Sequence, residues 1–543
     1  MTLRAPAVAV VLLLAACARP CGPCPPCGPA TPAAADAAVA ADAADLERAL
    51  DAILADDAGA PAAVDRATTL VERRLADGRL RPALDVLAAR FRARHPAAAN
   101  RVTDAGRVTA FAGAQLWLRG RHPTLPSVAA PTWAALADAH AAFLASSAVP
   151  RAARSLADPT FVAELEAAGG APFLDGNDVE VLVDGPASWA VREPLLAGAT
   201  GDLWIASWAL YDDRTGREAV DTLLARAAAG ARVTFVVDGQ TASLPPYDDE
   251  VTRLETEALR RGLPVTVTRW RDAARPFDGM HWKLLIAGDA FLVGGMNFGD
   301  AYSHKDRAPG RGWRDTDVVV RGPAVAEARR SFAARFRGAP SSSRHVAPGG
   351  DAAPSADARP AGERVAVVVH APGDDDPVLK SLLKAIDGAT RTVDLEHAYV
   401  VRVPSVEAAL VAAVRRGVRV RVLTNSLESC DEPVVAQAIV RSVGPLADAG
   451  VEVWLRRGST LHSKFAAIDG VFAQVGSYNL HPRSLRLEHE VVVNVLGPRT
   501  AARLHAAFEA DLGAATRVRS SADLPPLEDP LARLAWWLCR DLL

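Results

Sequence analysis

The sequence predicts an α/β protein of two repeated domains, each a mixed, mostly parallel sheet flanked by helices, preceded by an α-helical N-terminal region. Two His-x-Lys signatures, His281 with Lys283 and His462 with Lys464, lie in matching contexts. The run at residues 230–235 recurs at 417–422, and the run at 262–267 recurs at 450–454. Features that repeat in one order at nearly one spacing indicate duplication. We therefore expect one active site built from both halves of the chain.

The composition fits a globular protein of two or three domains. The chain has 543 residues, of which 50% are hydrophobic and 23% charged, an ordinary balance for packed cores. A net charge of -3 and a pI near 6.5 lack the concentrated basic character of nucleic-acid binders. The bulk numbers therefore do not favour nucleic acid as a partner.

The first residues predict export. Arg4 precedes an apolar stretch at residues 5–16, which is too short to span a bilayer but has the length of a secretory signal. It ends in Leu14-Ala15-Ala16-Cys17, which resembles the bacterial lipobox. This resemblance implies a lipoprotein signal peptide at residues 1–17, acylation of Cys17, and a lipid-anchored, periplasm-facing protein of the bacterial cell envelope, at the inner or outer membrane. The alternatives are an uncleaved signal anchor and cleavage by an ordinary peptidase.

Residues 18–44 are nearly all Ala, Pro, Gly, Asp and Thr, and we interpret them as a disordered tether because they offer few large apolar groups to pack. Its cysteines, Cys21, Cys24 and Cys27, are interpreted as tether thiols; a zinc site is the alternative. Residues 45–175 show Ala, Leu and Arg at helical spacing and predict a helical domain without a catalytic constellation. Its histidines, His95, His122 and His140, are interpreted as surface or satisfied core residues.

Strand-like runs alternating with helical segments begin near residue 179 and again near 365, as expected for β-α-β units. We assign the first repeated domain to residues 178–337, a Pro, Ser, Ala and Gly-rich linker to 338–363, and the second repeated domain to 364–520. Residues 521–543 predict a C-terminal amphipathic helix. Its apolar stripe is expected to pack on the body of the protein rather than in a membrane interface.

The second copy carries the pattern His-x-Lys-x4-Asp-x6-Gly-Ser-x-Asn without a gap. The residues concerned are His462, Lys464, Asp469, Ser477 and Asn479. With this motif the chain resembles the phospholipase D superfamily, over roughly residues 178–520. The resemblance implies the fold of that superfamily and a metal-independent phosphodiester chemistry, so no cofactor and no required metal are expected.

The first copy departs from this pattern. Gly288 stands where Asp is expected after His281 and Lys283, and Asp289 follows one place later, before Asn297. One residue is missing from the hairpin. Because glycine tolerates unusual dihedral angles, we expect a shortened turn at Gly288-Asp289 to absorb the loss, so that His281, Lys283 and Asn297 still converge.

Stretches outside the minimal motif are similar to bacterial cardiolipin synthases. They are residues 294–302, 313–316, 424–427 and 479–484, followed by Glu490, although His481 stands where Asp is frequent. The likeness implies a phosphatidyltransferase or phospholipase D-type phosphodiesterase acting on a glycerophospholipid such as phosphatidylglycerol, with one chain supplying the whole active site as a monomer. The alternatives are a metal-independent secreted nuclease of the same superfamily and a degenerate, non-catalytic lipid-binding module.

The residue types suit a phosphodiester, whose anionic oxygens repel nucleophiles. One imidazole can attack phosphorus as a neutral nucleophile while the other, in its charged form, donates a proton, and lysines with asparagines can hold the nonbridging oxygens. By analogy with the superfamily we assign His281 as the nucleophile, giving a phosphohistidine, and His462 as the general acid; the reverse assignment stays open. Asp317 and Glu490 each precede a run of valines, and we expect them to orient the imidazoles.

Overall fold

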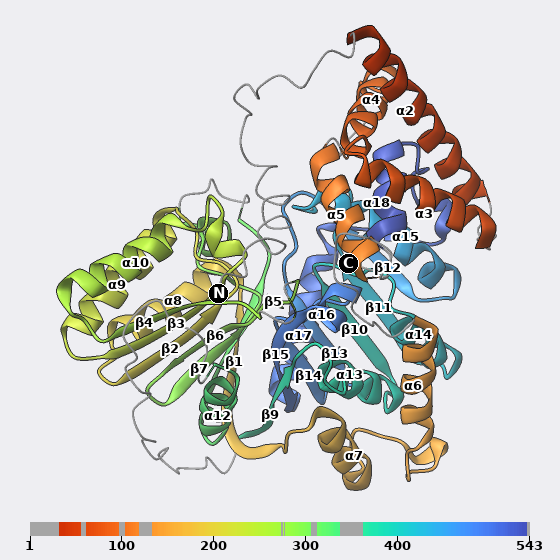
Figure 1. Cartoon of the computed structure of the whole chain (residues 1–543). Helices are drawn as coiled ribbons and strands as arrows, with labels where there is room; N and C mark the ends of the chain where they lie inside the picture. The colour runs from red at the N-terminus through yellow and green to blue at the C-terminus, as the bar shows by residue number, and fades with distance from the viewer. Residues whose placement is uncertain are drawn as a thin grey trace.

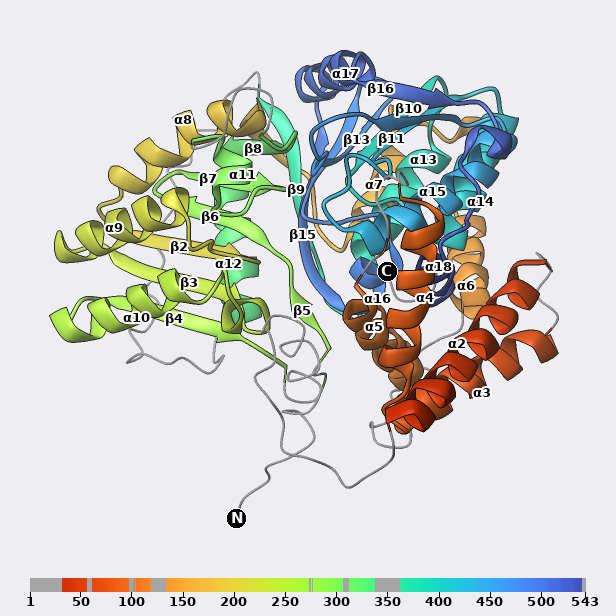
Figure 2. The same ribbon diagram turned by 90° about the horizontal axis from the view of Figure 1, so that it is seen from above.

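The computed structural model describes residues 32–55, 61–96, 102, 104–118, 133–272, 275, 277–305, 312–336 and 362–539. Over this part of the chain one mixed sheet runs through the molecule, and the two repeats form its two halves (Figures 1 and 2). β1 (Leu174–Val183) and β9 (Glu363–His370) pair antiparallel where the halves meet. Of the predicted linker at 338–363, only the last two residues are described, and β9 begins with the second of them.

The first half of the sheet follows the order β4-β3-β2-β6-β7-β8-β1. Its further strands are β2 (Asp202–Ser207), β3 (Arg232–Asp238), β4 (Val265–Trp270), β6 (Lys283–Ala287), β7 (Ala290–Gly294) and β8 (Thr316–Arg321). β2 pairs parallel with β3, and β3 with β4, while the other ladders are antiparallel. The predicted mixed α/β class is confirmed. β6 and β8 run against the other strands of this half.

The second half repeats this pattern. Its strands are β10 (Thr392–His397), β11 (Arg419–Thr424), β12 (Glu452–Arg456), β13 (Lys464–Ile468), β14 (Phe472–Gly476) and β15 (Glu488–Leu496), with an added edge strand β16 (Ala515–Val518). The order β9-β15-β14-β13-β10-β11-β12 mirrors that of the first half. The short β5 (Gly279–Met280) leaves the first repeat and pairs parallel with β15 of the second.

The hairpin of the first motif is one residue shorter than that of the second. Ala287 pairs with Ala290 across a two-residue turn, whereas Ile468 pairs with Phe472 across three residues. Gly288 takes up the difference with a φ of 56°, which glycine adopts without steric cost. β6 and β7 therefore keep the pairing of β13 and β14, as the sequence predicted.

Helices cover both faces of the sheet. α8 (Asp184–Ala197), α9 (Arg214–Ala228) and α10 (Asp249–Arg261) cover one face of the first half, and α13 (Pro377–Asp387), α14 (Pro404–Arg415) and α15 (Pro433–Asp448) follow the corresponding strands of the second. On the opposite face, α12 (Ala324–Phe336) and α17 (Pro498–Leu512) share a hydrophobic core that spans both repeats. The two halves are thereby joined by packing as well as by β1 and β9.

The prediction of a disordered tether at 18–44 is wrong for residues 32–44, which form the first part of α2 (Pro32–Ala55). Alanine has the highest helix propensity, and Ala43 and Leu46 are buried. Asp42 is buried beside them and lies 2.7 Å from a guanidinium nitrogen of Arg74. The alanine-rich composition therefore specifies a packed helix here. The predicted signal peptide, Cys17 and the other cysteines before residue 31 lie outside the described residues.

The N-terminal helices share their core with the second repeat. α3 (Pro61–Ala76) and α4 (Leu80–Arg94) pack on α2, and α5 (Ala105–Leu118) packs on α3 and α4. The C-terminal α18 (Pro530–Cys539) packs on α2 and α4 and lies between α5 and α15 (Figure 1). α6 (Trp133–Ala145) packs on α14, and α7 (Pro159–Gly169) on α13. The apolar stripe of α18, including Leu531, Leu534 and Trp537, is buried. In the regions described, no helix combines the length and apolar character needed to cross a membrane.

Replacing Leu46 by Ala tests whether α2 belongs to the core. Leu46 is 1% exposed, so we expect the Leu46→Ala variant to lose about 2 to 5 kcal/mol of unfolding free energy, as large-to-small core changes do. Denaturant unfolding checks this. Arg48→Ala is the matched control on the same helix, because the Arg48 side chain is 70% exposed and should change the free energy by less than about 1 kcal/mol. Equal stability of both variants would contradict the placement of α2.

Candidate active site

The imidazole of His281 is held by a carboxylate from the other repeat. Its Nδ1 lies 3.0 Å from both oxygens of Glu490, on β15, and 3.8 Å from Glu488. Glu490 is fully buried and also accepts hydrogen bonds from the hydroxyls of Ser477 and Ser484. Fixing Nδ1 in this way leaves Nε2 as the ring nitrogen that can react.

The imidazole of His462, in the second repeat, is held by a carboxylate of the first repeat. Its Nδ1 lies 2.8 Å from Asp315, which precedes β8 in the first repeat. The ring is 5% exposed and packs edge-on against Tyr302 at 5.2 Å between ring centroids. Each histidine therefore takes its orienting carboxylate from the repeat to which it does not belong.

Backbone hydrogen bonds cross the boundary in the same way. The amide of His281 donates to the carbonyl of His489 at 2.9 Å, and the amide of His462 donates to the carbonyl of Arg314 at 2.7 Å. His489 immediately precedes Glu490, and Arg314 immediately precedes Asp315. The two crossings are equivalent in the duplicated fold, and together they bring both motifs to one edge of the sheet.

The prediction that Asp317 orients an imidazole is wrong. The carboxylate of Asp317 is buried and paired with Arg192 at 2.7 Å, and the hydroxyl of Ser188 donates to it. Strand register explains the error: Gly294 lies opposite Asp317, whereas Gly476 lies opposite Val492. The counterpart of Glu490 is therefore two residues earlier than Asp317, at Asp315. The shared valine run suggested an alignment that the strand pairing does not follow.

The two lysines start the strands β6 and β13, two residues after the histidines. Lys283 Nζ donates to the carbonyl of His281 at 2.9 Å, and Lys464 Nζ lies 2.8 and 3.1 Å from the ring nitrogens of His462. Burial lowers the pKa of Lys283 to about 7, helped by the nearby charge of Lys464. Burial also lowers the pKa of Lys464 to about 8, against the opposing effect of Asp315.

Burial and charge set the protonation of the His462 and Asp315 pair. Burial raises the pKa of Asp315 to about 8, with Asp317 adding to the rise and Lys464 opposing it. Burial, together with the positive charges of Lys464 and Lys283, lowers the pKa of His462. Both shifts favour a proton on the Asp315 carboxyl, shared with the His462 ring through this hydrogen bond.

The asparagines of the two motifs follow β7 and β14. Asn297 Oδ1 accepts from Ser207 and from the amide of Ala209, both at 3.3 Å, and its Nδ2 donates to the Tyr302 hydroxyl at 3.0 Å. Asn479 Oδ1 is buried without a hydrogen-bond partner among the described residues. A buried amide oxygen without a donor is costly, and a hydroxyl group of a substrate would satisfy it.

Asp469 does not lie among these groups. It sits in the turn at the far end of β13, with a φ of 54°, and its carboxylate accepts from the backbone amides of Thr390, Arg391 and Thr392. The motif aspartate of the second repeat thus fixes the start of β10. Among the described residues of the first repeat, where Gly288 stands in the shorter turn, no side chain makes the equivalent contact.

Two residues that the sequence analysis did not assign hold the histidine segments in place. Asp238, at the end of β3, accepts from the amide of Met280 at 2.9 Å, and Asn425, after β11, accepts from the amide of Leu461 at 3.0 Å. Each amide belongs to the residue before a motif histidine. Their equivalence was detectable, because both follow the repeated run that begins at Gly230 and Gly417.

Among the described residues, two clusters have donors spaced for a metal ion. One is His281, Glu488 and Glu490; the other is Asp212, Asp248 and Asp249. In the first cluster the carboxylates already accept from Ser477, Ser484 and Arg483. Carboxylates held by these hydrogen bonds are suited to orienting the His281 imidazole, so no metal-dependent step is assigned to this cluster.

The fold and the paired His, Lys and Asn residues define a phospholipase D-like enzyme. The family model described as "Cardiolipin synthase, PLD-like domain" matches residues 382–512. Cardiolipin synthase A of Pseudomonas aeruginosa (strain LESB58) is 31% identical over 342 residues, 63% of this chain and 68% of the relative. Cardiolipin synthase A of Pseudomonas entomophila (strain L48) is 28% identical over 362 residues, 64% of this chain and 71% of the relative.

The chain belongs to the cardiolipin synthase family of the phospholipase D superfamily and is an enzyme of the phosphatidyltransferase or phosphodiesterase type. The fold is also similar to that of phosphatidylserine synthase from Haemophilus influenzae Rd KW20. That crystal structure is 14% identical in sequence, with a TM-score of 0.54, and the match covers 70% of this chain and all of the other.

Replacing Asp315 by Asn tests the corrected carboxylate assignment. Asn keeps the size and the contact to His462 Nδ1 but cannot hold the shared proton, so we expect kcat to fall about 10²-fold with the fold intact. Steady-state kinetics and thermal unfolding measure both effects.

Asp317→Asn is the matched control. It leaves the buried Arg192 guanidinium without its carboxylate, which should cost about 3 to 5 kcal/mol of stability, while the remaining folded enzyme keeps kcat within a few-fold. If Asp317→Asn reduces kcat as much as Asp315→Asn, the assignment is wrong.

Proposed function

We propose that the protein transfers a phosphatidyl group between two glycerophospholipids, converting two molecules of phosphatidylglycerol into cardiolipin and glycerol through a phosphohistidine. The observation that carries the proposal is the reciprocal exchange of carboxylates, His281 with Glu490 and His462 with Asp315. It gathers two imidazoles and two buried amines from separate repeats. The family relation supports a phospholipid as the substrate.

In the first half-reaction Nε2 of His281 attacks phosphorus and the bond from phosphorus to the glycerol oxygen breaks. The Glu490 carboxylate accepts a hydrogen bond from the Nδ1–H of His281 and stabilises the positive charge that forms on this ring. The Asp315 and His462 pair supplies one proton, through Nε2 of His462, to the departing glycerol. Lys283 and Lys464 neutralise the nonbridging oxygens as negative charge develops.

In the second half-reaction a hydroxyl of another phosphatidylglycerol takes the place vacated by glycerol. His462 removes its proton, the oxygen attacks phosphorus, and the bond to His281 breaks. The Asp315 and His462 pair thereby regains the proton that it gave to glycerol, so the enzyme returns to its starting state. The unsatisfied oxygen of Asn479 supports this step, because an alcohol hydroxyl is the donor that it lacks.

We also propose that the protein acts as a lipid-anchored enzyme of the bacterial cell envelope, facing the periplasm. This rests on the lipobox-like Leu14-Ala15-Ala16-Cys17. An anchor at Cys17 would keep the site beside its membrane substrate. Because one chain supplies both histidines, a monomer suffices for the reaction.

Product analysis tests the transfer. Purified protein with vesicles of phosphatidylglycerol is expected to yield cardiolipin and glycerol, measured by mass spectrometry. If phosphatidic acid is the main product, the reaction is hydrolysis and not transfer. Digestion of single-stranded DNA without lipid turnover would reject the lipid substrate.

Trapping tests the role of His281. Acid-free quenching during turnover, followed by peptide mapping, should find a phosphatidyl adduct on His281 and none in the His281→Ala variant. The His281→Ala variant should lose activity by about 10⁴-fold or more, because nucleophile and acid act as a unit. An adduct on His462 would reverse the two roles.

The pKa values predict an alkaline decline in kcat/KM, which reports groups of the free enzyme. Lys283 with a pKa of about 7, Lys464 with about 8 and Asp315 with about 8 all carry their useful proton at lower pH. Raising the pH through 7 to 8 therefore removes positive charge from the phosphate site and the proton of the acid pair. A constant kcat/KM between about pH 6 and pH 9 would contradict these assignments.

A further inference from the structure

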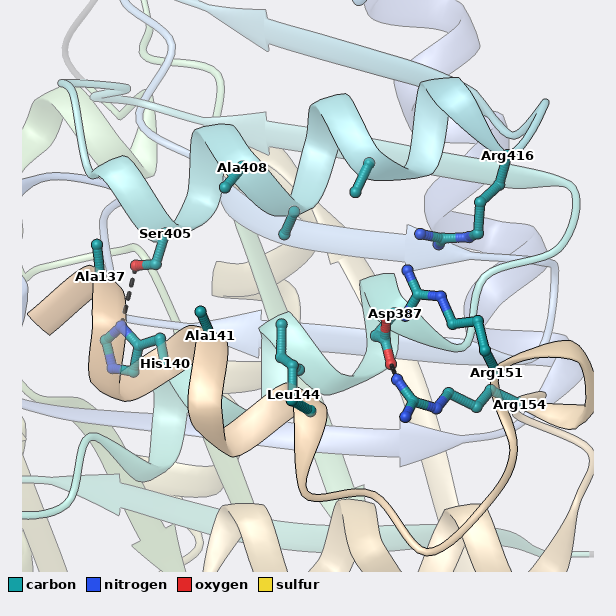
Figure 3. A pocket seen from close by; sticks show the side chains of 13 residues that line it. Ala137, His140, Ala141, Leu144, Arg151, Arg154, Asp387, Ser405, Ala408 and Arg416 are labelled. Atoms are coloured by element: carbon teal, nitrogen blue, oxygen red, sulfur yellow. Dashed lines mark hydrogen bonds and ion pairs between the residues drawn. The ribbon is translucent and has the colours of Figure 1, made fainter.

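A groove of about 330 Å³ lies between α6 of the N-terminal region and α14 of the second repeat (Figure 3). The residues that line it are distinct from both histidine and lysine motifs. A concave, mostly apolar space of this size with a few placed polar groups is typical of a small-molecule site. Its two ends differ in charge.

The walls of the groove are small apolar side chains at helical spacing. α6 contributes Ala137, Ala141 and Leu144, and α14 contributes Ala408 and Ala412 on the facing side. Alanine at these positions leaves room along the length of two packed helices. An unbranched hydrocarbon chain fits such a space, because it can bury apolar surface against both helices.

One end of the groove carries an excess of positive charge. Arg151, Arg154 and Arg416 gather there around Asp387, as Figure 3 shows. Asp387 is already paired with Arg151 and Arg154, the latter at 2.7 Å. Arg416 donates to the carbonyl of Ile386 at 2.8 Å, and no carboxylate of the described residues forms an ion pair with it. Burial and the neighbouring charge of Arg151 lower the pKa of Arg416.

The opposite end is closed by a hydrogen-bonded histidine. His140 is 1% exposed, its Nδ1 lies 3.0 Å from the Ser405 hydroxyl, and its Nε2 lies 3.1 Å from Asp376. The hydrogen bond between His140 and Ser405 fixes α6 on α14, and the contact with Asp376 places a carboxylate beside this end of the groove. The charges therefore orient an amphiphile with its anionic group toward the arginines.

We infer that this groove binds an anionic glycerophospholipid, with one acyl chain between α6 and α14 and the phosphate at Arg151, Arg154 and Arg416. Three guanidinium groups against one carboxylate match a phosphate, which arginine recognises through its forked donors. The site is separate from the reaction centre. Its occupation does not depend on the turnover proposed above.

Photolabelling tests this site directly. The full chain carrying His281→Ala, which blocks the covalent step, is mixed with phosphatidylcholine vesicles containing phosphatidylglycerol with a diazirine on one acyl chain. We expect crosslinks to peptides that contain residues 133–145 and 404–416. Arg416→Glu should reduce this labelling about tenfold or more, as expected for a lost charge-assisted bond, and Ala408→Trp should reduce it by filling the groove.

Arg415→Glu is the matched control, because Arg415 is the exposed last residue of α14, next to Arg416, but does not line the groove. Labelling should be unchanged in this variant and weak with a phosphatidylcholine probe. Equal loss in Arg415→Glu and Arg416→Glu would overturn the inference, as would equal labelling by phosphatidylcholine or by a free fatty acid probe. Labels confined to peptides of the histidine motifs would also overturn it, while leaving the proposed reaction intact.

Discussion

The active site depends on one constraint: each motif histidine is held by the repeat to which it does not belong. His281 takes a backbone acceptor and Glu490 from the second repeat, and His462 takes a backbone acceptor and Asp315 from the first. Neither imidazole would be oriented in an isolated repeat. The pairing of β1 with β9 and the shared core under α12 and α17 are the features that keep this exchange in register. The fold is therefore part of the chemistry, because it sets which carboxylate meets which ring.

The duplication preserves the frame but not the electrostatics. Ser207 lies opposite Lys283 in the first repeat, whereas His397 lies opposite Lys464 at the equivalent position of the second. The side-chain amide of Asn297 has hydrogen-bond partners for its oxygen and its nitrogen, whereas Asn479 Oδ1 has none among the described residues. One imidazole faces two glutamates, and the other shares a proton with an aspartate of raised pKa. Such differences between two equivalent halves suit a reaction that needs one nucleophile and one acid.

Much of the fold and of the site followed from the sequence, because repeated motifs report geometry that both halves must satisfy. The two-domain α/β architecture, the shortened hairpin at Gly288 and the role of Glu490 in orienting an imidazole were predicted. That this imidazole is His281, in the other repeat, was not predicted. Asp315 was missed because counting along the chain from a valine run cannot detect a register difference of two residues between strands. Asp469 was taken as part of the reaction centre because the motif spacing does not show at which end of β13 each side chain lies. The start of α2 was missed because composition alone does not separate an alanine-rich tether from an alanine-rich helix whose small side chains pack.

The most direct test of the central claim is to compare kcat for His281→Ala, His462→Ala and the double variant. If the two repeats build one site, each single variant falls to nearly the level of the double, by about 10⁴-fold or more, because the two groups act as a unit. If each repeat instead carries its own site, each single variant keeps about half of the activity and only the double variant loses it. The second result would contradict the shared site and with it the exchange on which this account rests.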